Sequence, residues 1–157
     1  MHARTLIYII WGRIMPWDRE IYTNRELSHE EIVATLGTFF NIKMNHIVVS
    51  ENHEWVNTHD DDTCVACDIS YFKGDFPLCL WIAHFPAKFE TYPPFNLEAV
   101  GTLCEMFDCH ALVAIGDFDP GDDCMYTLVR PKADYQVVEV DVRHLDSNHE
   151  FVITKYL

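Results

Sequence analysis

Residues 78–85, LCLWIAHF, form an almost continuous apolar run that is bounded on both sides by turn-forming residues. Gly74, Asp75 and Pro77 precede the run, and a proline-rich connection, PAKFETYPPF, follows it. The run is far too short to span a membrane and has the length of a buried strand. Because a buried strand needs hydrogen-bonded neighbours, the chain is expected to build a sheet.

Other segments have the composition of strands that could pair with residues 78–85 in such a sheet. β-Branched and aromatic residues predict strands at residues 4–10, 43–50, 64–72, 110–115, 125–130 and 134–142, and an edge strand in the tail EFVITKYL. In the strand at 64–72, alternation places Val65, Cys67, Ile69 and Tyr71 on one apolar face. Residues 11–27 contain Gly, Pro and mixed charges, which indicate a long connection.

Two segments have helical periodicity. Ser28 and Glu31 have the spacing of a capping box, and the apolar residues that follow, Ile32, Val33, Leu36, Phe39 and Phe40, line one helical face. Asn96 can cap a second helix that continues to about Asp108. This helix should bury Leu97, Val100, Leu103, Cys104 and Phe107 and expose Glu98, Thr102 and Glu105.

These elements predict an α+β fold with a single, mainly antiparallel sheet and two helices packed on it, in the order β-α-β-β-β-α-β-β-β. The 157 residues fit one domain, for which roughly 68 to 70% of the unfolded surface can be buried. The N-terminal apolar run at 6–11 is too short for a membrane span or a signal peptide. A soluble, cytoplasmic protein is therefore expected, with cysteines that are mostly reduced.

The net charge of −14 comes from two segments of the chain. Between Lys43 and Lys73 there are six acidic residues and no Lys or Arg, and between Lys88 and Arg130 there are eight acidic residues and no Lys or Arg. This distribution argues against direct nucleic-acid binding, which depends on Lys and Arg. It favours a basic partner, a metal ion, or solubility alone.

The first acidic segment contains NHEWVNTHDDDTCVACD at 52–68, where His53, His59, Cys64 and Cys67 are possible zinc ligands. Their spacing does not match a standard zinc finger, and in an extended strand Cys64 and Cys67 point to opposite faces. Cys67 is more simply a core residue. A thioredoxin-like redox motif is disfavoured because no helical run follows the two cysteines.

The second acidic segment, GDFDPGDDC at 116–124, offers oxygen ligands for calcium but lacks the glycine and glutamate positions of an EF-hand. Asp, Pro and Gly also form turns, so a hairpin connection is the simpler interpretation. The chain contains no Gly-x-Ser-x-Gly, phosphate-binding glycine loop or His-Glu-x-x-His motif. No catalytic residues are predicted.

The segment LEAVGTLCEMFDCHALVAIGDFDPGDDCMYTLVRPKADYQVVEVDVRHLD, residues 97–146, resembles small cytoplasmic immunity proteins of bacterial polymorphic-toxin and contact-dependent inhibition systems. The similarity lies in the succession of a helix, a strand, an acidic Asp/Pro turn, a strand that ends near Pro, a polar turn and a V-x-V-D strand. The resemblance implies a bacterial protein that neutralises a partner and has no catalysis of its own.

The charge and the resemblance together predict an acidic inhibitor that binds a basic protein, a nuclease-type toxin. The expected contact residues are an aromatic residue and the carboxylates of each acidic segment: Trp55, Asp60, Asp61 and Asp62, and Phe118, Asp117, Asp119, Asp122 and Asp123. One alternative is a phage-type nucleic-acid mimic that blocks a defence or DNA-handling protein. Another is a zinc enzyme or zinc-stabilised domain that uses His53, His59, Cys64 and Cys67.

Overall fold

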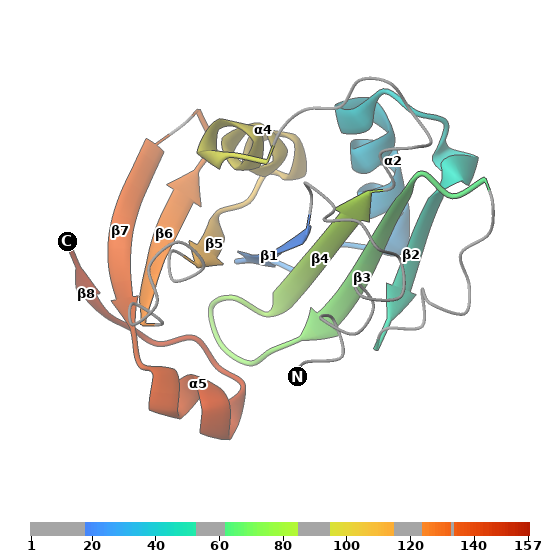
Figure 1. Ribbon diagram of the computed structural model, residues 1–157. Coiled ribbons are helices and arrows are strands. Elements are labelled where there is room, and N and C mark those ends of the chain that lie inside the picture. Colours follow the sequence, from blue (N-terminus) through green and yellow to red (C-terminus); the bar gives the residue numbers. More distant parts are fainter. Residues whose placement is uncertain (1–17, 53–61, 85–94, 115–123, 133) are drawn as a thin grey trace.

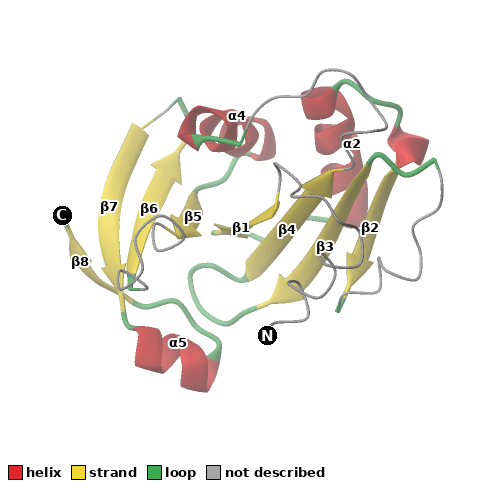
Figure 2. Cartoon of the chain, in the orientation of Figure 1, coloured by secondary structure: helices red, strands yellow, loops and turns green. Residues whose placement is uncertain are grey.

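The computed structural model describes residues 18–52, 62–84, 95–114, 124–132 and 134–157. Within these residues one eight-stranded sheet is accompanied by three α-helices and a short 3-10 helix (Figure 1). Figure 2 shows the same elements by type, with α2 and α4 behind the sheet and α5 beyond the ends of β7 and β8.

The strands are β1 (Asp18–Thr23), β2 (Ile47–Glu51), β3 (Val65–Tyr71), β4 (Leu78–His84), β5 (Ala111–Ala114), β6 (Met125–Arg130), β7 (Asp134–Val140) and β8 (Ile153–Tyr156). The helices are α2 (His29–Phe40), α4 (Leu97–Phe107) and α5 (Val142–Asn148), and the 3-10 helix spans Met44–His46.

The strands lie in the order β2-β3-β4-β1-β5-β6-β7-β8. Each neighbouring pair is antiparallel except β2 and β3, which are parallel. This arrangement confirms the predicted α+β class and the mainly antiparallel sheet. The tail also forms the predicted edge strand, since β8 pairs with β7.

The position of β1 differs from the prediction. The strand predicted at 4–10 lies outside the described residues, and β1 falls within the segment predicted to be a connection. Its sequence, DREIYT, begins with three charged residues, which is unusual for a strand in the middle of a sheet. β1 nevertheless pairs with β4 along six residues and with β5 through Tyr22 and Thr23, so it joins the two halves of the sheet.

Helix α2 begins and ends as its sequence predicts. The Ser28 hydroxyl accepts a hydrogen bond from the Glu31 backbone N–H at 3.1 Å, and the Glu31 carboxylate accepts one from the Ser28 N–H at 2.8 Å. These two bonds form a capping box. Ile32, Leu36 and Phe40 are buried, and Asn41 ends the helix in the left-handed conformation at φ 53°.

Helix α4 follows the same scheme. The Asn96 side chain accepts a hydrogen bond from the Ala99 N–H at 2.8 Å, and Asp108 ends the helix with φ 51°. The interior residues are buried as predicted, but Leu97 is 37% exposed. Leu97 occupies the first helical position, where its side chain lies at the margin of the buried face.

The two faces of the sheet carry separate apolar clusters. One cluster contains Leu36, Leu80 and Leu103 and lies between the sheet and the helices α2 and α4. The other is aromatic, with Tyr22, Tyr126 and Phe151 in contact. Strands β3 and β4 are therefore buried on both faces for most of their length, as the apolar run at 78–84 predicts.

Two boundaries are corrected by the structure. The strand predicted at 43–50 begins later, at Ile47, because Met44–His46 form a 3-10 turn. The strand predicted at 134–142 ends at Val140, because the Asp141 side chain accepts a hydrogen bond from the His144 N–H at 3.0 Å and starts helix α5. That helix has two turns and was not expected from the sequence.

Leu36→Ala should destabilise the fold by about 3 kcal/mol, because Leu36 is fully buried against the sheet and its loss leaves a cavity. The matched control is Leu97→Ala, which should change the free energy of unfolding by less than about 0.5 kcal/mol. Urea unfolding followed by circular dichroism measures both values. Equal losses in the two variants would contradict the described packing of α2 and α4.

Candidate partner-binding surface

Most residues predicted to contact the partner lie outside the described residues. These are Trp55, Asp60, Asp61, Asp117, Phe118, Asp119, Asp122 and Asp123, together with the possible zinc ligands His53 and His59. The structure does describe Asp62, which is exposed, and Cys64 and Cys67, which are buried.

The strands fix where the two acidic segments begin and end. The first segment leaves β2 after Glu51 and enters β3 after Cys64, whose N–H donates to the His46 carbonyl at 2.8 Å. Because β2 and β3 are parallel, these two points lie at opposite ends of the strand pair. The second segment connects β5 and β6, which are antiparallel neighbours, so the predicted hairpin connection is confirmed.

Four described residues form a polar cluster where the first acidic segment leaves the sheet. The cluster contains Glu26, His29, Glu51 and Tyr71 and is called the Tyr71 patch below. The Tyr71 hydroxyl donates to Glu51 Oε1 at 3.1 Å, and His29 Nε2 lies 3.4 Å from the same oxygen. Tyr71 is 53% exposed, which makes it an aromatic side chain that a partner can reach.

Tyr71 follows Val65, Cys67 and Ile69 in the predicted alternation, but unlike them it is not buried. These three residues are fully buried under the helices. Tyr71 is the last residue of β3, and His29, its neighbour through Glu51, is the first residue of α2. Helix α2 therefore covers this face of β3 as far as Ile69 but not at Tyr71. An alternating sequence pattern alone does not show where such a cover ends.

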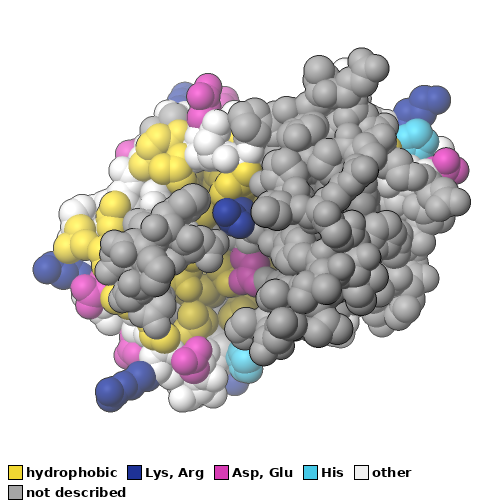
Figure 3. All heavy atoms as spheres, viewed as in Figure 1, with side chains coloured by type: hydrophobic (Ala, Val, Ile, Leu, Met, Phe, Trp, Pro, Cys, Tyr) yellow, Lys and Arg dark blue, Asp and Glu magenta, His cyan; other side chains and the backbone are white. Residues whose placement is uncertain are grey.

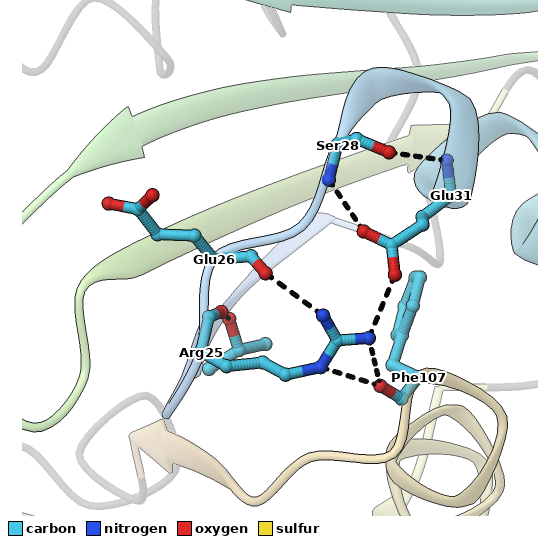
Figure 4. Close-up of polar contacts among 6 residues, drawn as sticks. Arg25, Glu26, Ser28, Glu31 and Phe107 are labelled. Atoms are coloured by element: carbon cyan, nitrogen blue, oxygen red, sulfur yellow. Dashed lines mark hydrogen bonds and ion pairs between the residues drawn. The ribbon is translucent and has the colours of Figure 1, made fainter.

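The electrostatic environment of Tyr71 is negative. Partial burial, the hydrogen bond to Glu51, and the charges of Glu51 and Glu26 all raise the pKa of the Tyr71 phenol. The Glu26 carboxylate is not paired with Arg25, the residue before it in the chain. Figure 4 shows that the Glu26 carboxylate points away from the Arg25 guanidinium, which binds Glu31 at 2.9 Å.

Cys64 and Cys67 lie in different environments. Cys67 belongs to the core cluster under the helices, and burial, followed by the nearby Cys79 and Asp68, raises the pKa of its thiol above its usual range. Cys64 Sγ lies 3.9 Å from His46 Nδ1. The core interpretation of Cys67 is thus confirmed. Among the described residues, no three His, Cys, Asp or Glu side chains are grouped closely enough to hold a metal ion.

A groove of about 820 Å³ lies beside the β3–β4 turn that follows Tyr71. Phe76, Leu128 and Phe151 are its buried lining residues, and Arg130 and Tyr156 also line it. Arg130 is engaged by Asp134 at 3.3 Å and by Gln136 at 3.1 Å. Because its lining mixes both charges with apolar residues, the groove is less suited to a basic partner than the Tyr71 patch.

The described charges are not gathered on the face shown in Figure 3. There the Asp and Glu side chains (magenta) and the Lys and Arg side chains (dark blue) lie singly or in small groups around hydrophobic ones. Comparisons with known protein families, curated proteins and solved structures gave no match. In the described part of the chain, the helices are too short or too polar to cross a membrane.

Glu51→Gln should lower the pKa of Tyr71, because it removes a negative charge beside the phenol. In the wild type the folded-state pKa lies above the unfolded value of about 10. The protonated Tyr71 phenol therefore contributes its full stabilisation of the folded state below the unfolded-state pKa of about 10. This contribution is lost as the pH rises through the higher folded-state pKa. Carbon-13 NMR of labelled tyrosine measures both titrations. Identical Tyr71 titrations in the two proteins would contradict the described contact.

Proposed function

We propose that the chain is an acidic inhibitor that binds a basic protein, a toxin of nuclease type, without catalysis of its own. The observation that carries the proposal is the Tyr71 patch, where an exposed aromatic side chain adjoins two carboxylates on a chain of net charge −14. Interfaces concentrate their binding energy in such aromatic residues, and complementary charge increases the association rate.

The chemistry of the patch suits an arginine or lysine of the partner. A guanidinium can stack on the Tyr71 ring while Glu26 and Glu51 accept its hydrogen bonds. A nuclease needs a basic cleft for its substrate, so an inhibitor with fixed carboxylates can enter that cleft and block it. The first acidic segment starts beside the patch at Asn52 and returns to the sheet near Asp62, at the opposite end of the β2–β3 pair. We propose that Trp55 and Asp60 to Asp62 contribute a further contact region.

The resemblance to immunity proteins supports the same proposal. Within residues 97–146 the elements α4, β5, β6 and β7 follow the order of that resemblance, whereas α5, which begins at Val142, is not part of it. We propose that the acidic connection between β5 and β6 is a second contact region, with Phe118 and the four aspartates at 117, 119, 122 and 123.

The direct test is native mass spectrometry of the tagged chain, purified gently from its own cells at low salt. The proposal expects a mass above 18.3 kDa that is explained by a basic polypeptide. That polypeptide should cleave nucleic acid when alone and lose this activity when the chain is added back. A captured protein that is acidic, or that stays active in the complex, would refute the proposal. A metal-sized increment would favour the zinc alternative.

The triple variant Tyr71→Ala, Glu26→Gln, Glu51→Gln should bind the captured partner at least about tenfold more weakly, because it removes the aromatic residue and both carboxylates. The matched control is Tyr135→Ala, Glu98→Gln, Glu105→Gln, which removes a half-exposed tyrosine and two exposed carboxylates elsewhere. Titration calorimetry at ~0.1 and ~0.5 M salt gives the affinities, and the wild-type affinity should fall with salt. Equal losses in the two variants would exclude the patch from the interface.

Converting Asp117, Asp119, Asp122 and Asp123 to Asn should leave the fold intact and weaken partner association, because four negative charges are lost from one connection. A control variant removes four exposed charges elsewhere, with Glu30, Glu98 and Glu105 changed to Gln and Asp146 to Asn. Thermal unfolding and binding are measured for both. An unchanged affinity in the first variant would remove this connection from the proposed interface.

A further inference from the structure

Two cysteines meet at the C-terminal end of α4. The Cys109 N–H donates to the Cys104 carbonyl at 3.0 Å, and Asp108 between them is left-handed with φ 51°. This is a Schellman ending, in which the residues at these two positions usually touch through their side chains. The hydrogen bond keeps the two Cα atoms within about 7 Å of each other, close to the range that a disulfide spans.

The two thiols interact within the core. Cys104 is 1% exposed and Cys109 is 4% exposed, and both belong to the cluster between the helices and the sheet. The Cys104 thiol donates a hydrogen bond to the carbonyl of Val129 at 3.7 Å. The two thiols also interact with each other, and this interaction shifts the pKa of each. Both cysteines are free thiols.

A cation lies beside this pair. The Arg25 guanidinium donates two hydrogen bonds to the carbonyl of Phe107, at 3.0 and 2.7 Å, two residues before Cys109 (Figure 4). The hydrogen bond from Cys104, assisted by the charge of Arg25, lowers the pKa of the Cys109 thiol. The same hydrogen bond raises the pKa of Cys104, so Cys109 loses its proton first.

We propose that Cys104 and Cys109 are a redox pair that a peroxide converts into a disulfide within the folded chain, with Cys109 as the attacking sulfur. Because both sulfurs are almost completely buried, the oxidant must be small and uncharged, and hydrogen peroxide satisfies this requirement. Most buried cysteines are inert. This pair differs because the Schellman ending holds its two residues at a separation that a disulfide can span.

The reaction balances with one peroxide. Cys109 loses its proton, and its thiolate attacks one peroxide oxygen so that an S–O bond forms and the O–O bond breaks. The released hydroxide takes up the proton that Cys109 lost and becomes water. Cys109 is then a sulfenic acid. The Cys104 sulfur attacks this sulfur, the S–S bond forms, and the sulfenic hydroxyl leaves with the Cys104 proton as a second water. Two thiols are oxidised and one peroxide is reduced to two waters.

The test exposes the folded wild-type chain to hydrogen peroxide, blocks the remaining thiols and maps the cysteines by mass spectrometry. A Cys104–Cys109 disulfide should form first and be reversed by dithiothreitol. Cys67 and Cys79 provide a control within the same molecule, because they are equally buried and should stay reduced. If the pair stays reduced while the fold persists, or if Cys67 is oxidised equally fast, the proposal is wrong.

Two sets of variants assign the roles of the residues. In Cys104→Ser, dimedone should trap a sulfenic acid at Cys109, whereas in Cys109→Ser no sulfenic acid should form at Cys104. Arg25→Gln keeps both thiols and should slow oxidation roughly threefold or more, because the thiolate fraction falls, and Arg25→Lys should restore it in part. Circular dichroism confirms that each variant is folded. Oxidation that is equally fast in Arg25→Gln would refute the role of the cation.

Discussion

The guanidinium of Arg25 is the contact on which the arrangement of the two large helices depends. It satisfies the carbonyl of Phe107 at the end of α4 and binds Glu31, which closes the capping box at the start of α2. A cation is favourable at a helix C-terminus, where carbonyls lack partners. Because Arg25 lies two residues after the end of β1, one side chain fixes the end of α4 and the start of α2 relative to the central strand.

The two sites proposed above, the Tyr71 patch and the Cys104–Cys109 pair, lie on either side of this contact. Glu26, the next residue, faces away from Arg25 and contributes to the Tyr71 patch. Cys109 lies on the other side, where the same cation favours its thiolate. The hydrogen bond from the Ser28 backbone, followed by the one from Arg25, lowers the pKa of Glu31, so the contact persists to a lower pH than the ordinary pKa of a glutamate would allow.

The sequence predicts those parts of the fold that have local causes. Ser28 and Asn96 mark their helices because each side chain bonds to a backbone group three residues later. The strand β1 could not be recognised, because its stability comes from pairing with β4 and β5 and not from its own composition. The exposure of Tyr71 could not be derived from the alternation for a related reason, since it depends on where a helix from another part of the sequence begins.

The distribution of the positive charges bears on the proposed inhibitor. A net charge of −14 destabilises a compact chain through self-repulsion, and its few cations could relieve that cost by pairing with surface acids. Arg25 pairs with Glu31 and Arg130 pairs with Asp134, so neither cation is paired with the carboxylates of the Tyr71 patch. The Tyr71 patch is left with His29 as its described cationic neighbour, and that side chain is charged only when protonated. A basic partner would supply the missing countercharge, so the repulsion that the free chain tolerates becomes a driving force for binding.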